Sequence, residues 1–163
     1  MNPFSMKTVP FRNGFKIDLS GTLNETAKLD KLPSDKFTEL FINLNFLANI
    51  NSIGIRNWIL WCKHLPVQPQ FTFSHCPCFF VEQMSAIRGL VPPGSIISSF
   101  YIPYFCESCN CEDHFLAELG VHYKREKAGD WSLHLKDKTC ARCIRPMEVS
   151  TNLNKYFRFF KLI

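Results

Sequence analysis

Hydrophobic positions in the first two thirds of the chain repeat with two different periods. A period of two, or a short run that is apolar on both faces, is typical of a strand, whereas a period of three to four is typical of a helix. The strand pattern occurs at residues 15–19, 37–44, 70–74 and 95–105. The helix pattern occurs at residues 22–32, 53–64 and 77–88. Strands that alternate with short helices predict an α/β fold, with a mostly parallel mixed sheet and covering helices.

The segment 53–64 carries the clearest helix signals. Its apolar face is formed by Ile55, Trp58, Ile59 and Cys62. Ser52 precedes it and is a favourable N-cap residue. The spacing places Trp58 in the core and leaves Trp61 as the tryptophan more suited to a surface.

The character of the chain changes near residue 103, because cysteines and charged residues become frequent beyond it. We therefore expect an α/β domain at residues 1–103 and a small β subdomain at residues 104–148. The last segment, residues 149–163, contains an aromatic run at 156–160 that must dock against the rest of the protein.

Two Cys-x-x-Cys units dominate the chemistry of the second part: Cys106 with Cys109, and Cys140 with Cys143. Each unit can direct two thiolates inward from a tight turn, and two such turns complete a four-thiolate shell around one zinc ion. Four thiolates leave no open position for a substrate, so the pattern predicts a structural zinc ribbon. Free or redox-active thiols are the alternative.

Neighbouring residues offer other ligands. Cys111 or His114 can replace a thiolate in the first unit. The 30 residues between the two units favour a long hairpin, with arms at 114–125 and 131–136 around a turn at 128–130. The cluster His75-Cys76-Pro77-Cys78 also resembles a metal-binding segment, but buried core cysteines at a strand-to-helix turn are the simpler interpretation.

Charge and hydropathy narrow the functional classes. The net charge of +5 is divided as +3 over residues 1–103 and +2 over residues 104–163, with no long basic run. A nucleic-acid-binding protein usually concentrates its charge. The start of the chain lacks a signal-peptide pattern, and no apolar run approaches the roughly 18 residues that span a bilayer. We expect a cytoplasmic protein whose cysteines remain reduced.

Two short motifs carry a family resemblance. Residues 17–21, Ile-Asp-Leu-Ser-Gly, and residues 50–55, Ile-Asn-Ser-Ile-Gly-Ile, resemble the strand and the Asp-Ser-x-Gly turn of STAS domains, the fold of bacterial anti-anti-sigma factors. The chain as a whole is similar to bacterial STAS-like proteins with a C-terminal zinc ribbon. The segment Pro103-Tyr104-Phe105 before the first cysteine, and the Tyr156-Phe157 ending, carry that longer resemblance.

The resemblance implies a regulatory role through Ser52. In anti-anti-sigma factors the matching serine is phosphorylated, which switches partner binding. A phosphate at a helix N-terminus is favoured by free amides and the helix dipole. Asn51 stands where the family has aspartate. Ser52 as a simple helix cap is the alternative.

These observations favour a non-enzymatic docking module that binds a protein partner. The alternative is nucleic-acid binding by the ribbon hairpin, whose basic and aromatic residues are Lys124, Arg125, Lys127, Lys136, Lys138, Tyr123 and Trp131. Acidic residues in the same hairpin weaken that alternative. Neither a catalytic triad nor a glycine-rich phosphate loop can be recognised, so we expect no enzyme.

Overall fold

The computed structural model describes residues 3–127 and 130–161. Its elements are β1 (Ser5–Phe11), β2 (Gly14–Leu23), β3 (Glu39–Ile50), α1 (Ser52–Lys63), β4 (Gln70–Ser74), α2 (Cys78–Ala86), β5 (Ile96–Ile97), β6 (Ser99–Cys106), β7 (Cys111–Glu118), β8 (Tyr123–Arg125), β9 (Trp131–Leu133), β10 (Lys138–Thr139), β11 (Pro146–Val149), α3 (Leu153–Tyr156) and the 3-10 helix η1 (Phe157–Lys161). The fold is mixed α/β, as the sequence pattern predicts.

The first sheet has five strands in the order β1-β2-β3-β4-β5. β1 and β2 form an antiparallel hairpin, and the remaining neighbours are parallel. Gly14 begins β2 where the backbone of β3 lies very close, since a Cβ atom there would lie 1.7 Å from the Glu39 carbonyl oxygen. Only glycine fits this position.

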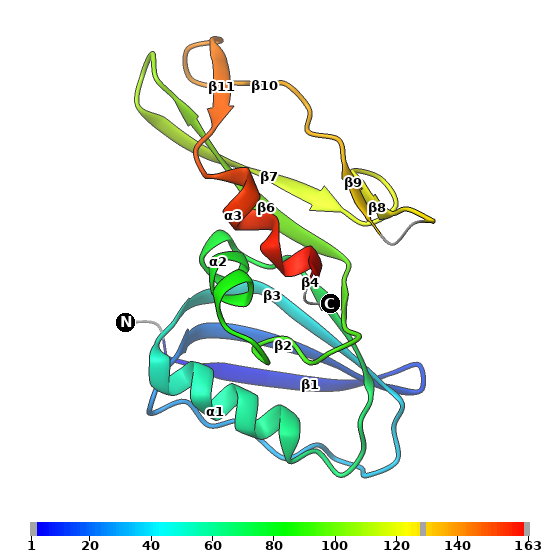
Figure 1. Ribbon diagram of the computed structural model, residues 1–163. Helices are drawn as coiled ribbons and strands as arrows, with labels where there is room; N and C mark the ends of the chain where they lie inside the picture. Colours follow the sequence, from blue (N-terminus) through cyan, green and yellow to red (C-terminus); the bar gives the residue numbers. More distant parts are fainter. Residues whose placement is uncertain (1–2, 128–129, 162–163) are drawn as a thin grey trace.

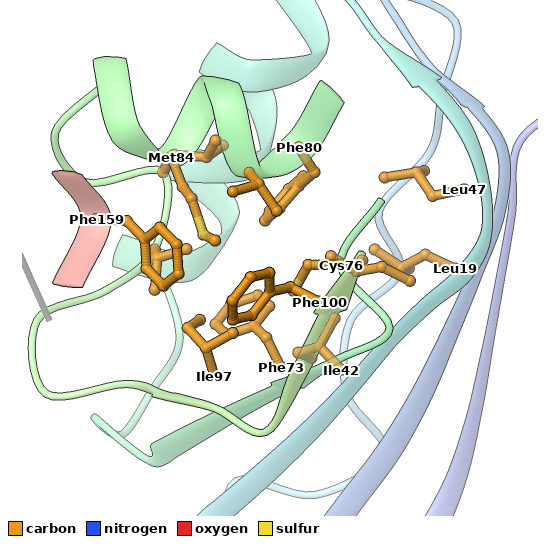
Figure 2. Packing of buried hydrophobic residues seen from close by; sticks show 14 of the residues in the cluster. Leu19, Ile42, Leu47, Phe73, Cys76, Phe80, Met84, Ile97, Phe100 and Phe159 are labelled. Carbon is orange, nitrogen blue, oxygen red and sulfur yellow. The ribbon is translucent and has the colours of Figure 1, made fainter. Parts of the chain in front are cut away.

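Helices α1 and α2 lie on one side of this sheet (Figure 1). Side chains of β2 alternate between buried and half-buried, so one face of the strand packs under the helices. In Figure 2, Phe80 and Met84 of α2 face Phe73 and Phe100 in the interior. The rings of Phe73 and Phe80 are 6.2 Å apart between centroids. The core is therefore rich in aromatic rings, to which the 16 phenylalanines of the chain contribute.

The second sheet has four strands in the order β10-β11-β6-β7, and β8 and β9 form a separate small hairpin. The predicted strand at 95–105 is divided into β5 and β6, which belong to different sheets. Ser98 separates them, and its amide and hydroxyl both donate to the Phe73 carbonyl oxygen, at 2.7 and 2.9 Å. The boundary expected between residues 103 and 104 lies within β6, so this strand connects the two parts of the molecule.

The C-terminal segment returns to the first domain and packs beside α2 (Figure 1). Tyr156 and Phe159 are buried. The Ser85 hydroxyl donates to the Tyr156 carbonyl oxygen at 2.7 Å, and the Tyr156 hydroxyl donates to the Tyr101 carbonyl oxygen at 2.5 Å. The aromatic ending therefore joins the end of the β subdomain to the α/β core.

Two local expectations are wrong. Residues 22–32 form no helix: β2 continues to Leu23, and a turn follows in which the Asn24 side chain accepts from the Thr26 amide at 3.0 Å. Asparagine side chains compete with helical bonding in this way. The N-cap of α1 is Asn51, whose side chain accepts from the Gly54 amide at 2.8 Å, and Ser52 is the first helical residue.

The strand pairing expected between the two cysteine units is also wrong, because residues 114–125 and 131–136 do not form one long hairpin. β7 pairs with β6 along its whole length, and only β8 and β9 form a hairpin with each other. The expected turn at 128–130 includes residues 128 and 129, which lie outside the described residues. Within the described part of the chain, none of the helices combines the length and apolar character needed to cross a lipid bilayer.

Candidate metal centre

The two Cys-x-x-Cys units occupy the ends of two hairpins in the second sheet. Cys106 ends β6 and is opposite Cys111 at the start of β7, so the first unit forms the loop of that hairpin. Cys140 and Cys143 lie in the loop between β10 and β11. Because β6 and β11 are neighbours, the two loops are held side by side.

The loops share a backbone feature. In each, the residue after the second cysteine has a left-handed conformation, with φ of 53° at Asn110 and 60° at Ile144. The Ile144 amide donates to the Cys140 carbonyl oxygen at 2.9 Å, which closes the second loop. Asparagine tolerates this conformation, whereas a β-branched residue is strained in it. The strain at Ile144 indicates that the loop geometry outweighs the local preference of the residue.

The four sulfur atoms converge on one point. All lie within 4.8 Å of one another. The Cys106 and Cys143 sulfurs are 3.4 Å apart, and those of Cys109 and Cys140 are 3.6 Å apart. All four cysteines are unpaired by disulfides. The cluster can therefore hold a metal ion.

The protein environment favours the ionised thiolate at Cys140 and the neutral thiol at Cys109. The backbone amides of Cys143 and Arg142 lower the pKa of Cys140 to about 6. Burial, followed by contact with the three other cysteines, raises the pKa of Cys109 to about 12. Four thiols at this spacing cannot all ionise without a cation between them.

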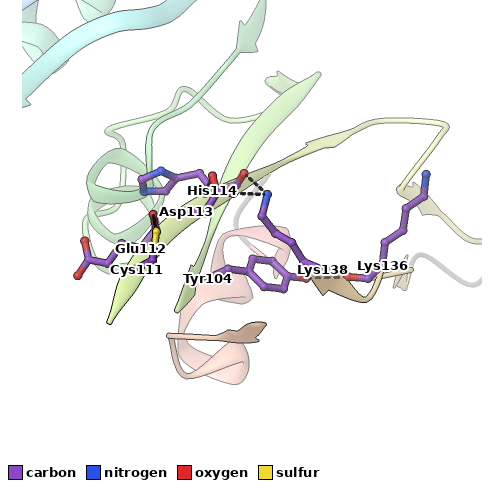
Figure 3. A network of polar contacts seen from close by, with 7 residues as sticks. All are labelled: Tyr104, Cys111, Glu112, Asp113, His114, Lys136 and Lys138. Atoms are coloured by element: carbon purple, nitrogen blue, oxygen red, sulfur yellow. Dashed lines mark hydrogen bonds and ion pairs between the residues drawn. The ribbon is translucent and has the colours of Figure 1, made fainter. Parts of the chain in front are cut away.

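Neither of the two alternative ligands, Cys111 and His114, belongs to the cluster of four cysteines. Cys111 is half-buried next to it, and its thiol donates to the Glu112 carbonyl oxygen at 3.6 Å. The imidazole of His114 points away from the Lys138 side of β7 (Figure 3). That ring instead lies 6.3 Å from the ring of Tyr101, between centroids. In the described residues, only the four predicted cysteines group closely enough for a metal.

A polar network beside the cluster ties β10 to β7 (Figure 3). The Lys138 ammonium is 2.9 Å from the Asp113 carboxylate and donates to the His114 carbonyl oxygen at 3.0 Å. The hydrogen bond from Lys138 holds the pKa of Asp113 below its usual range. The Tyr104 hydroxyl donates to the Lys136 carbonyl oxygen at 3.2 Å. These contacts fix the strand that leads into the second cysteine loop.

The other residues singled out in the sequence lie elsewhere. Ser52 is exposed on the first turn of α1. Trp58 is buried, as expected. Trp61 is half-buried: it stacks on Trp58 with centroids 5.3 Å apart, and its indole donates to the Asp30 carbonyl oxygen at 2.9 Å. Cys76 is fully buried at the turn before α2, in agreement with a core cysteine.

The aromatic residues of the ribbon hairpin face inward. Tyr123 is 1% exposed, and its hydroxyl donates to the Ile97 carbonyl oxygen. Trp131 is half-buried and stacks on Phe160 with centroids 4.8 Å apart. Stacking on nucleic-acid bases requires an open ring face. Tyr123, named for the nucleic-acid alternative, does not offer one.

Comparisons with known protein families, with curated proteins and with solved structures give no match to this chain.

Proposed function

We propose that this protein is a non-enzymatic docking module of the bacterial cytoplasm, with a STAS-like α/β domain that binds a protein partner and a zinc ribbon that is structural. The observation that carries the proposal is the turn between β3 and α1. Its four residues divide into two that build the turn and two that face solvent.

Asn51 and Gly54 build the turn. Asn51 caps the helix, and Gly54 permits close packing, because a Cβ atom there would lie 1.9 Å from the Leu23 carbonyl oxygen. Ser52 and Ile53 remain exposed, and the exposed fraction of Ile53 is 46%. An apolar side chain beside a modifiable hydroxyl at a helix N-terminus is suited to a partner contact that a charge can switch.

The electrostatics of this turn bear on phosphorylation. The Asn51 amide group donates to the Glu25 carboxylate at 2.8 Å. Hydrogen bonds from its own backbone amide and from Asn51 lower the pKa of Glu25, which is ionised at neutral pH. A phosphate on Ser52 would meet the favourable helix dipole and the unfavourable carboxylate together. Ser52 is therefore proposed as a partner contact first, and as a modification site second.

The four cysteines suit zinc better than other metals. A tetrahedron with Zn–S bonds of about 2.3 Å has sulfurs about 3.8 Å apart. Two of the separations here, 3.4 and 3.6 Å, are close to that value, and all are within 4.8 Å. Four soft thiolates favour zinc or iron, and two loops of this type are typical of structural zinc. Bound zinc would stabilise a subdomain too small to fold on its own core.

Site-specific photocrosslinking tests the docking proposal. A photoreactive phenylalanine analogue replaces Ile53 in one variant and the exposed Lys36 in a matched control, and both are expressed in bacterial cells. We expect a discrete protein adduct from position 53 that disappears when Ser52→Asp is added. Equal adducts at both positions, or none at position 53, would contradict the proposal.

The nucleic-acid alternative is not proposed. Its basic residues remain, but Lys124 pairs with the Glu126 carboxylate at 3.4 Å, and Lys138 pairs with Asp113. The hairpin aromatics pack inward, as described above. A salt-dependent shift with labelled RNA would revive this alternative.

A further inference from the structure

A small cavity lies between the two sheets, at the end where β4 stops. Its volume is about 170 Å³. Its walls come from β3, the start of α2, β6 and β7, and are formed by Asn45, Pro77, Cys78, Tyr101 and His114. β4 ends at Ser74, which pairs with Asn43, so Asn45 projects just beyond the end of β4. In open α/β sheets, ligands bind outside the carboxyl ends of the parallel strands.

The turn that leads from β4 into α2 is strained. His75 has a φ of 53°, a left-handed conformation that few non-glycine residues adopt. Its Nδ1 atom is buried and has no hydrogen-bond partner within residues 3–127 and 130–161. The His75 ring lies 6.4 Å from the Tyr101 ring, between centroids. His75 does not line the cavity, but the strained turn that it forms positions Pro77 and Cys78, which do.

The walls of the cavity are rich in donors. The Tyr101 hydroxyl donates to the Asn45 Oδ1 atom at 3.0 Å, which leaves the Asn45 amide nitrogen to donate elsewhere. The exposed His114 also lines the cavity, with its ring near that of Tyr101. Among the residues that the structure describes, no Asp, Glu, Lys or Arg lines the cavity. Glu82 lies on the next turn of α2 and is not part of the wall.

The start of α2 adds one further donor at the cavity wall, the amide of Cys78, because Cys78 lines the cavity and Phe79 does not. The N-cap of α2, Pro77, provides no side-chain cap. Among the described residues, the amides of Phe80 and Val81 donate to the Pro77 carbonyl oxygen, while the Cys78 and Phe79 amides have no acceptor. The partial positive charge of a helix N-terminus lies at this wall. Burial raises the pKa of the Cys78 thiol, and the carboxylate of Glu82, on the next turn of α2, raises it further.

A metal ion suits this cavity less well. The Cys78 thiol donates to the Tyr101 carbonyl oxygen at 3.6 Å, and burial raises its pKa, so it stays neutral. In the described residues, the only cluster spaced for a metal is the one formed by the ribbon cysteines.

We propose that the cavity binds a small oxyanion, a carboxylate or a phosphate group, through Asn45, His114 and the free amide of Cys78. The volume admits a group of a few heavy atoms, such as inorganic phosphate or the end of a larger acidic metabolite. The site is independent of the docking function proposed for the turn at Ser52.

NMR titration of the ¹⁵N-labelled full chain, with zinc in the buffer, tests this proposal. Sodium phosphate and sodium acetate are added separately at constant pH and ionic strength. We expect saturable shifts of the Cys78 amide and of the His114 ring. Saturation with one salt alone identifies the class of oxyanion, and saturation with both identifies the shared carboxylate and phosphate chemistry.

Asn45→Asp is the sharpest variant, because it keeps an acceptor for Tyr101 while it removes a donor and adds a negative charge. We expect its affinity to fall about tenfold or more, the loss that follows removal of a hydrogen bond to a charged group. Asn49→Asp, an exposed position on the same strand, makes the same change in net charge and should bind normally. His114→Ala removes an exposed ring and should also weaken binding. Shifts that do not saturate, or equal affinity in the two aspartate variants, would overturn the proposal.

Discussion

Ile144 provides a direct test of how the second cysteine loop is held. Its φ of 60° places a β-branched residue in the left-handed region, and its side chain packs little, since its exposed fraction is 74%. Asn110 occupies the matching position in the first loop with a φ of 53°. Ile144→Asn should therefore relieve strain, and Asn110→Ile should introduce it.

The expected change in the free energy of unfolding for Ile144→Asn is the difference between two opposing contributions. A left-handed conformation costs an L-residue about 1–2 kcal/mol, and asparagine avoids much of this cost. Full burial of an isoleucine side chain contributes about 1.5–3 kcal/mol, so the quarter buried at Ile144 contributes about 0.5 kcal/mol. The net expectation is a stabilisation of about 1 kcal/mol by Ile144→Asn. In a chain of this length that raises Tm by about 2–4 °C.

Thermal unfolding measures the Tm of each variant. Zinc is kept at a fixed excess, because metal bound to the folded state contributes to its stability. Asn110→Ile should lower Tm by a comparable amount. A competition assay with a chromophoric chelator should show zinc affinity changing in the same directions. If Ile144→Asn lowers Tm, the Ile144 side chain makes a contact worth more than the strain, and the argument from backbone conformation fails.

Other outcomes follow from the same structure. Cys140→Ser should abolish the zinc mass increment in native mass spectrometry, whereas Cys111→Ser should retain it; retention in both would remove Cys140 from the ligand set. Gly54→Ala should destabilise the protein by about 1–3 kcal/mol, the usual cost of overpacking, and urea unfolding should show a lower midpoint. An unchanged midpoint would mean that α1 can move to accommodate the added methyl group, contrary to this prediction. Because its folded pKa is depressed, the Asp113 carboxyl contributes stability above the ordinary aspartate pKa of about 3.9 and loses it as pH falls through the lower folded value. Asp113→Asn should remove this acid dependence and cost less than about 1 kcal/mol at neutral pH, since the pair with Lys138 is partly exposed; an identical acid limb in both proteins would contradict the assignment.

The sequence alone determined the features that depend on local spacing. The period of two after Gly14, the helical spacing of Ile55 and Trp58, and the apolar run at 70–74 each correspond to an element of the structure. The cysteine cluster was also predictable, because two residues between cysteines suffice to fix a tight turn. The identity of its metal and the partner of the exposed turn stay predictions.

Tertiary structure decided the features in which contacts with distant segments override local sequence preferences. Residues 22–32 have helical spacing, but pairing with β3 extends β2 to Leu23, and Asn24 then turns the chain. Asn51 rather than Ser52 caps α1 because the chain enters the helix from β3 with Asn51 in an extended conformation. Side-chain preferences alone do not distinguish two adjacent polar residues at a helix start.

The cavity beside α2 was beyond the reach of sequence reasoning. Asn45, Tyr101 and His114 come from three strands in two sheets, and no motif connects them. Periodicity reports which residues share a face of one element, whereas the meeting of several elements depends on how the sheets pack. The sequence therefore specified several of the elements and the cysteine loops, and the packing of the two sheets created the cavity.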